Sequence, residues 1–177
     1  MSSNNSKQIY LYIDSGTSGY MLAQLLPGNL HIVALTNAIN IAAELLSRTH
    51  ITVVMIGGEL QPGTLSCRGA VAEDSLNRFH VDIAFIGTNA VGRNGDLYIG
   101  SVTETGYKKT ILGTAEKKYV MADSSKLGKL SLCRFASAKD IDGIITDEGI
   151  SRALASELAE NGANMMIADV VHKKAAK

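Results

Sequence analysis

The sequence predicts an α/β fold, in which a doubly wound, mostly parallel sheet carries helices on both faces. Short apolar runs rich in β-branched residues alternate along the chain with segments of helical period. Several of these runs are apolar without interruption, as is typical of strands buried on both faces. The length of 177 residues, with 46% apolar and 19% charged residues, suits one soluble domain with a continuous core.

The first half of the chain is predicted to contain three strands, each followed by a helix. In the second helix, Ile39, Ala42, Ala43 and Leu46 fall on one face at helical spacing. Paired glycines end the third strand, and a turn is predicted at Pro62–Gly63. The predicted strands are Ile9–Ile13, His31–Leu35 and Ile51–Gly58, and the predicted helices are Thr17–Leu26, Ile39–Ser47 and Val71–Phe79.

The second half continues the alternation, with one irregular segment. Residues 91–102 are rich in glycine, which indicates a mobile or ligand-responsive loop. We expect residues 8–170 to form the domain, residues 1–7 a disordered leader and residues 171–177 a frayed tail. The predicted strands are Val81–Ala90, Lys118–Asp123, Gly143–Asp147 and Asn164–Asp169, and the predicted helices are Thr103–Ala115 and Ser151–Asn161.

Composition argues against several classes of protein. Seventeen basic residues balance seventeen acidic ones, so the chain lacks the positive field that a free-standing DNA binder usually has. No apolar run approaches the roughly 20 residues that span a bilayer, and the polar start lacks the features of a signal peptide. Two cysteines and four scattered histidines predict neither a disulfide framework nor a metal site. We therefore expect a cytoplasmic protein with no metal, no cofactor and no membrane partner.

The segment Asp14–Ser18 joins the first predicted strand to its helix. In an open parallel sheet, ligands bind outside the carboxyl ends of the strands. Unpaired amides at a helix start, a glycine and three hydroxyl groups suit an anion, and a phosphate group fits best. The same residue types also cap helices and form tight turns, so this segment alone leaves both interpretations open.

The ends of the other predicted strands carry small, amide, hydroxyl or charged residues, which indicates a site for a polar small molecule. Two cations, Arg68 and Lys126, can reach an anionic group, although each could equally be a solvated surface charge. Glu104 and Lys108 stand four residues apart on a predicted helix, where they could simply form a surface ion pair. The predicted strand-end residues are Thr36, Asn37, Gly57, Gly58, Glu59, Gly87, Thr88, Asn89 and Asp123.

An ordered set of motifs resembles the C-terminal sensor domain of DeoR-type bacterial transcriptional regulators. The resemblance covers about residues 9–168, nearly the whole chain, and the pairing of "ADSSK" with "TDEG" is its most specific part. The motifs are "IDSGTS", "LTNAINIAAEL", "VVMIGGELQPGTLSCRGAVAEDSL", "VDIAFIGTNAV", "ETGYKKTI", "VMADSSKLG" and "IDGIITDEG".

This resemblance implies a domain that binds a phosphorylated sugar or related metabolite and controls DNA binding by a separate N-terminal winged helix-turn-helix domain. No basic helix pair of that kind precedes Ile9, so the chain is expected to be an excised effector-binding domain or a natural truncation. Such regulators are also expected to assemble as dimers or tetramers through this domain.

The sequence is also similar to ribose-5-phosphate isomerase and its sugar-phosphate relatives, with a related doubly wound sheet. The resemblance places residues 15–18 on the phosphate loop, Lys126 on a lysine of the isomerases and Glu104 on a helix glutamate. Where the isomerases have "GADE", this chain reads "GTNA", so Thr88 and Asn89 replace groups that exchange protons. Recognition without turnover is therefore expected. The "YIGSV" segment at residues 98–102 also departs from the usual "TTPD", which bears on the identity of the ligand.

Three hypotheses follow. The chain is a sensor with no catalytic residues, or a sugar-phosphate isomerase with Glu104 as its base, or an oligomerisation module with a degenerate pocket. For the sensor, the predicted phosphate-binding residues are Asp14, Ser15, Gly16, Thr17, Ser18 and Lys126. The predicted residues for the rest of the ligand are Thr36, Asn37, Gly57, Gly58, Glu59, Arg68, Gly87, Thr88, Asn89, Glu104, Lys108 and Asp123.

Overall fold

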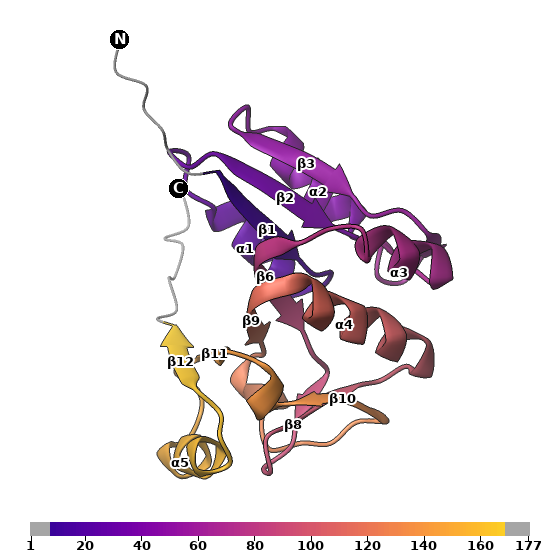
Figure 1. Ribbon diagram of the computed structural model, residues 1–177. Coiled ribbons are helices and arrows are strands. Elements are labelled where there is room, and N and C mark those ends of the chain that lie inside the picture. Colours follow the sequence, from indigo (N-terminus) through magenta and orange to yellow (C-terminus); the bar gives the residue numbers. More distant parts are fainter. Residues whose placement is uncertain (1–7, 169–177) are drawn as a thin grey trace.

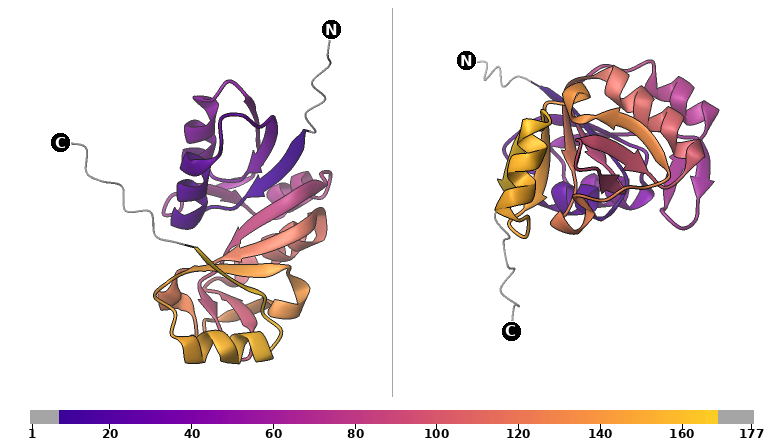
Figure 2. Two further views of the ribbon diagram at one scale, coloured as in Figure 1. Left: turned by 90° about the vertical axis from the view of Figure 1, so that its left-hand side faces the viewer. Right: turned by 90° about the horizontal axis from the view of Figure 1, so that it is seen from below.

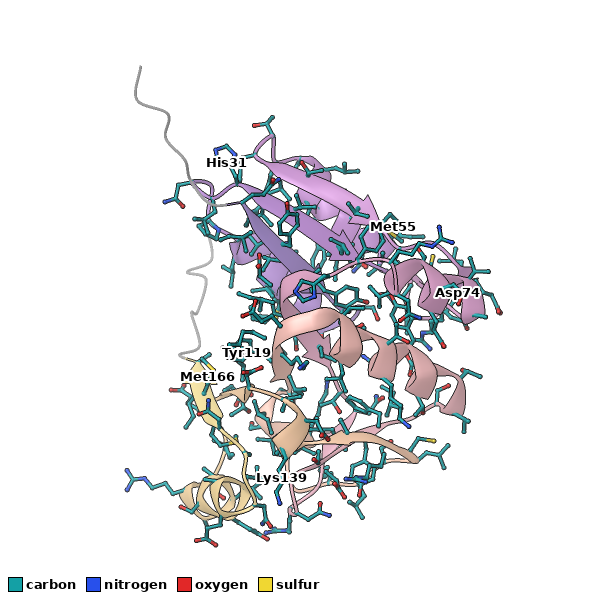
Figure 3. The ribbon with its side chains drawn as sticks, viewed as in Figure 1. His31, Met55, Asp74, Tyr119, Lys139 and Met166 are labelled. Atoms are coloured by element: carbon teal, nitrogen blue, oxygen red, sulfur yellow. The ribbon has the colours of Figure 1, made fainter. Side chains whose placement is uncertain are left out.

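A sheet of seven strands, all parallel, forms the centre of the computed structural model, which describes residues 8–168 (Figure 1). The spatial order is β12-β11-β9-β6-β1-β2-β3. Met55 on β3 and Met166 on β12 mark its two edge strands in Figure 3. The strands are β1 (Ile9–Ile13), β2 (Ile32–Thr36), β3 (Ile51–Met55), β6 (Val81–Gly87), β9 (Ala115–Met121), β11 (Gly143–Asp147) and β12 (Met165–Ala168).

Helices cover both faces of the sheet, which confirms the predicted fold class. Alternate residues of β1 point to opposite faces, as the pleat requires. Leu11 and Ile13 pack with Ala23 and Ile41 in the core cluster below α1 and α2, whereas Tyr12 belongs to the larger cluster below α3 and α4. The helices are α1 (Thr17–Leu25), α2 (Ile39–Leu46), α3 (Ala70–Leu76), α4 (Val102–Thr114) and α5 (Arg152–Glu160). Within residues 8–168, none of them has the length and apolar character needed to cross a membrane.

The predicted elements of the main sheet are present, and β1 and β11 have the predicted bounds. The prediction that residues 91–102 form a loop is wrong. They contribute to a three-stranded antiparallel sheet of β7 (Ala90–Val91), β8 (Asp96–Ile99) and β10 (Cys133–Ser137), which packs beside α4 (Figure 2). Leu97 and Ile99 are buried there. Gly95, at φ 80°, forms the tight turn between two of these strands, so glycine here marks a turn and not disorder.

A second unpredicted element is the hairpin of β4 (Glu59–Gln61) and β5 (Ser66–Arg68), whose connection contains the predicted turn at Pro62–Gly63. Backbone bonds attach it to the turn after β2, because Cys67 N donates to Asn37 O at 2.8 Å and Ile39 N donates to Leu65 O at 2.9 Å. This attachment brings Arg68, the last residue of β5, towards the carboxyl ends of the central strands.

Strands are added to the sheet on both sides of β1. The chain first forms β2 and β3 on one side and then returns to form β6, β9, β11 and β12 on the other. The loops after β1 and β6 therefore diverge above the same point of the sheet, where Asp14 N donates to Phe85 O at 3.0 Å. In open α/β sheets such a switch point creates a crevice at the carboxyl edge, which is the position expected for a ligand site.

Candidate functional site

A pocket of about 340 Å³ opens at this switch point, at the carboxyl ends of β1, β6 and β9. It collects predicted residues from five separate segments of the chain. These are Ser15, Gly16, Thr17, Ser18, Arg68, Gly87, Thr88, Asn89, Glu104, Lys108 and Lys126. Residues that the sequence pattern did not predict also line it, namely Gly19, Thr64, Ile99, Gly100 and Met121.

The N-terminus of α1 faces the pocket without a side-chain cap. Gly16 precedes the helix at φ 113°, a conformation that favours glycine, and its carbonyl accepts the first helical bond from Tyr20 N at 3.0 Å. Within the described residues, the N–H groups of Thr17, Ser18 and Gly19 have no hydrogen-bond partner. The positive end of the helix dipole and free backbone donors are therefore available to an anion.

Gly19 allows α1 to begin so close to β1. A Cβ atom at this position would lie 2.1 Å from the Asp14 carbonyl oxygen, and Gly87 approaches the same loop, with a Cβ position 3.3 Å from the Ser15 carbonyl oxygen. Two glycines thus permit the close backbone approach that defines the floor of the pocket. The only sequence signal for Gly19 is a glycine in the first turn of an apolar helix.

Asp14 is buried below the pocket and does not line it. Its carboxylate accepts from Ser15 N at 2.9 Å and from Gly87 N at 2.8 Å, and it forms an ion pair with the ammonium group of Lys108. Lys108 also donates to Gly87 O at 2.9 Å. The geometry therefore makes Asp14 a positioning residue that joins β1, β6 and α4, in place of the predicted contact with phosphate, and its negative charge is compensated by Lys108.

Glu104 and Lys108 do not pair with each other, so the surface-pair interpretation is wrong. Glu104 instead forms an ion pair with Arg68, and these side chains are 14% and 15% exposed. Arg68 Nη2 also donates to the hydroxyl of Thr64 at 3.1 Å. The pocket wall thus contains a guanidinium group whose positive charge is compensated by the carboxylate of Glu104.

Lys126 reaches the pocket from a 3-10 helix at Ser124–Lys126. Asp123 caps this turn by accepting from Ser125 N at 3.1 Å, and its Oδ2 lies 3.6 Å from Lys126 Nζ. A hydrogen bond from the Ser125 hydroxyl, with the nearby Lys126 charge, lowers the pKa of Asp123 from its usual range. Asp123 is outside the pocket lining and acts on the site by orienting Lys126.

The predicted residues at the end of β2 and just after it also lie outside the pocket. Thr36 is buried, and its hydroxyl accepts from Ala38 N at 3.2 Å. Asn37 donates to Cys67 O at 3.0 Å, and its Oδ1 accepts from the Tyr12 hydroxyl at 3.2 Å. Burial raises the pKa of Tyr12 well above its ordinary value, so this hydroxyl stays protonated. Both ends of the Asn37 side-chain amide are therefore hydrogen-bonded to groups in the protein interior.

Gly57, Gly58 and Glu59 follow β3, and they do not line the pocket either. A Cβ on Gly58 would lie 2.7 Å from the Arg68 carbonyl oxygen, so this glycine serves the close approach of the hairpin. Glu59 is exposed on β4. The strand order gives the reason: β3 lies two strands away from β1, so its end opens outside the crevice between β1 and β6.

Thr88 and Asn89 after β6 differ in what they offer. The Thr88 hydroxyl donates to backbone carbonyls, with Tyr98 O at 2.7 Å, so its hydrogen is already in a hydrogen bond within the protein. Asn89 Oδ1 accepts from Gly100 N at 2.9 Å, which orients its NH₂ group as the free end of the side chain. This contact also explains why Ile99 and Gly100 line the pocket: they belong to β8 and its end, in a segment predicted to be a loop.

Asp147 holds the turn that carries Lys126. It accepts from Ser124 N at 2.8 Å and from Gly149 N at 2.9 Å, and the bonds from Ser124 are the main reason that its pKa is lowered. A carboxylate with a lowered folded-state pKa stabilises the fold above its unfolded pKa of about 3.9, and this contribution is lost as the pH falls through the folded-state value.

We therefore expect Asp147→Asn to destabilise the protein at pH 7, and by progressively less as the pH is lowered from about 4 towards 2. Urea unfolding of both proteins between these values measures the difference, which should shrink below about pH 4. The exposed Asp74 on α3 (Figure 3) provides the matched control, Asp74→Asn. A difference between wild type and Asp147→Asn that stayed constant down to pH 2 would contradict the role given to Asp147.

Known proteins resemble this chain over most of its length. HTH-type transcriptional regulator GlpR of Haloferax volcanii is 31% identical over 156 residues, which are 88% of this chain and 61% of the regulator. HTH-type transcriptional repressor GlcR of Bacillus subtilis is 29% identical over 135 residues, 76% of this chain and 52% of the repressor. The glycerol-3-phosphate regulon repressor of Escherichia coli is 25% identical over 137 residues, 77% of this chain and 54% of that protein.

This chain thus spans between 52% and 61% of the length of these three relatives. Among solved structures, ribose 5-phosphate isomerase A of Methanocaldococcus jannaschii aligns with a TM-score of 0.47 and 21% identity, over 69% of this chain and 48% of the isomerase. Residues 6–148 match the sequence model of the family described as DeoR C terminal sensor domain. The chain belongs to this family of sensor domains.

Proposed function

We propose that this chain is the effector-sensing domain of a DeoR-family transcriptional repressor and that its effector is a phosphorylated sugar or a related metabolite. One observation carries the proposal: the uncapped N-terminus of α1 opens on the same pocket as Lys126 and Arg68. Because Lys108 compensates Asp14, the phosphate loop presents donors to the pocket without a free negative charge. Free amides, hydroxyls and nearby cations together suit a phosphate group.

The remaining part of the pocket suits a small polar body attached to that phosphate. Its volume of about 340 Å³ is at the lower end of ordinary ligand pockets, which span about 300–1,000 Å³. The NH₂ group of Asn89 and the backbone around Gly87 and Gly100 can read hydroxyl groups. The name of one relative, glycerol-3-phosphate regulon repressor, supports a phosphorylated effector.

In the full regulator, the effector would act by shifting a population of domain arrangements. A ligand can move such an equilibrium only by the difference in its affinity for the two states. This chain has no net charge, so we assign DNA contact to a separate N-terminal domain, brought together by a dimer or tetramer of the sensor domain. The names of the relatives as transcriptional regulators support a place in the cytoplasm.

A thermal-unfolding screen tests the proposal directly. Ribose 5-phosphate, glucose 6-phosphate and glycerol 3-phosphate would each be compared with the same molecule without phosphate. A ligand at 100 times its dissociation constant should add about 2.7 kcal/mol to the free energy of unfolding. Stabilisation by a phosphorylated compound and not by its partner supports the proposal. No stabilisation by any phosphosugar would favour an oligomerisation module with a degenerate pocket.

Two substitutions test the placement of the phosphate. We expect Lys126→Ala and Thr17→Ala each to weaken a phosphorylated ligand by about 10- to 150-fold, because a hydrogen bond to a charged group contributes about 1.5–3 kcal/mol. Titration calorimetry measures the effect, and the unphosphorylated sugar should be affected far less. Lys129→Ala, an exposed lysine on the same loop, is the matched control. Equal losses for both ligands would place the phosphate elsewhere.

The alternative function is that of a sugar-phosphate isomerase. The presence of Glu104 in the pocket favours it, because a carboxylate can act as a base. The occupied hydroxyl of Thr88 and the amide of Asn89 supply no second acid, and Arg68 holds the carboxylate of Glu104. Incubation with ribose 5-phosphate or fructose 6-phosphate separates the two functions, since formation of the isomeric sugar would establish an enzyme and binding without product a sensor.

A further inference from the structure

We propose that Glu104 is an internal counter-ion of Arg68, which the phosphate of the effector displaces on binding. The Arg68–Glu104 pair would then set the charge that a ligand needs in order to bind. This inference rests on the proposed function, because it requires a phosphorylated ligand in the pocket. It differs from the sequence-based expectation that Glu104 binds the part of the ligand that lies beyond its phosphate.

The position of the pair supports displacement. Arg68 ends β5 of the hairpin and Glu104 lies in the first turn of α4, and both side chains line the pocket beside the N-terminus of α1. Arg68 donates to the Thr64 hydroxyl, and Thr64 lines a neighbouring groove together with Gly16 and Thr17 of the phosphate loop. A phosphate on that loop would therefore lie close to the guanidinium group with which Glu104 forms its ion pair.

The charges of the pocket give the reason for an exchange. In the part of the chain that the structure describes, four ionisable side chains line it, namely Arg68, Glu104, Lys108 and Lys126. Asp14 compensates Lys108 and Glu104 compensates Arg68, which leaves Lys126, itself 3.6 Å from Asp123. A phosphate monoester carries about 1.5–2 negative charges at neutral pH, so it is repelled by a carboxylate in the same small cavity. The guanidinium binds phosphate with the same two-pronged geometry that it offers to a carboxylate.

Displacement would have a defined structural consequence. The hairpin is attached independently to the turn after β2, through Cys67 N to Asn37 O and Ile39 N to Leu65 O. It therefore stays in place when Glu104 is released, and the bond that is lost is the one between the hairpin and α4. The body of α4 is held by its packing against α3 and β10. The first turn of α4, which loses its bond to Arg68, is therefore the element expected to differ between the free and the bound protein.

Binding of inorganic phosphate to the full chain tests the inference, by titration calorimetry and by the rise in melting temperature with phosphate concentration. Removing the internal competitor in Glu104→Gln should tighten phosphate binding by about tenfold, the scale of one charge-assisted bond. Glu104→Asp, which keeps the charge but shortens its reach, should give a smaller gain. In an Arg68→Gln background, the gain from Glu104→Gln should largely disappear. Glu157→Gln, which breaks the exposed pair with Arg93, is the matched control and should change nothing.

A stability readout separates displacement from a purely structural role. Glu104→Gln leaves Arg68 without its partner, so in the absence of phosphate the variant should have a lower melting temperature than wild type. Added phosphate should raise the melting temperature of Glu104→Gln more than it raises that of wild type or of Glu157→Gln. Phosphate affinity that is unchanged or weaker in Glu104→Gln overturns the inference, while binding that still depends on Thr17 and Lys126 leaves the proposed function intact. Absence of phosphate binding in every protein overturns both.

Discussion

Replacing Lys108 with methionine is expected to lower the free energy of unfolding by about 3–5 kcal/mol, the usual cost of removing one partner of a buried ion pair. The Lys108 side chain is 6% exposed and that of Asp14 is 1% exposed. Loss of the ammonium leaves the Asp14 carboxylate buried, with the N–H groups of Ser15 and Gly87 as its remaining donors among residues 8–168. Urea unfolding followed by far-UV circular dichroism measures the change, since the chain has no tryptophan.

The neighbouring Lys109 supplies the control for this experiment. It is exposed on the same helix, so Lys109→Met should change the free energy of unfolding by less than about 0.5 kcal/mol. The double variant Asp14→Asn with Lys108→Met should be more stable than Lys108→Met alone, because it removes the uncompensated charge. A loss below about 1 kcal/mol for Lys108→Met would show that water or another group compensates Asp14.

Gly19→Ala is expected to destabilise the protein by about 3 kcal/mol or more, which is at the upper end of overpacking effects. The added Cβ would lie 2.1 Å from the Asp14 carbonyl oxygen and 3.1 Å from Cδ1 of Ile41. The first of these is a backbone atom at the end of β1, so relief requires α1 to move away from the sheet. Such a movement displaces the amides that face the pocket, and ligand binding should be lost together with stability.

The same substitution at Gly113 provides the comparison. Gly113 is exposed in α4 and a Cβ there meets nothing within 4 Å, so Gly113→Ala should stabilise the protein by about 0.5–1 kcal/mol through its better helix propensity. Urea midpoints of the two variants measure both effects in one series. Similar midpoints for Gly19→Ala and wild type would mean that α1 can shift without cost.

These two expectations concern the same physical problem, which is how an acidic residue can belong to a phosphate loop. Asp14 is required to hold the loops after β1 and β6 together, through Ser15 N and Gly87 N. Its charge would repel a phosphate if it were exposed. Burial and the pair with Lys108 remove that repulsion, and Gly19 lets α1 begin directly above the carbonyl of the same residue.

Local pattern was sufficient to predict the fold class and the elements of the main sheet. Continuous apolar runs indicated strands covered on both faces, and the strands at residues 9–13 and 143–147 have the predicted bounds. The rule that ligands lie at strand ends also predicted site residues at Ser15–Ser18, Gly87 and Lys126, which the structure brings to one pocket. Short elements with few apolar residues, such as β4 and β5, gave no comparable signal.

The sequence by itself determined the α/β architecture, the polar strand ends and the presence of opposing charges among them. Only the tertiary structure decided which strand ends meet and which charges pair. Asp14 and Lys108 are 94 positions apart, and Arg68 meets Glu104 across a hairpin that the periodicity did not reveal. Helical spacing placed Glu104 beside Lys108, but the reversal of strand order at β1 brings each to a different partner. Local periodicity reports the face of an element, whereas partners at long range depend on the order in which the strands assemble.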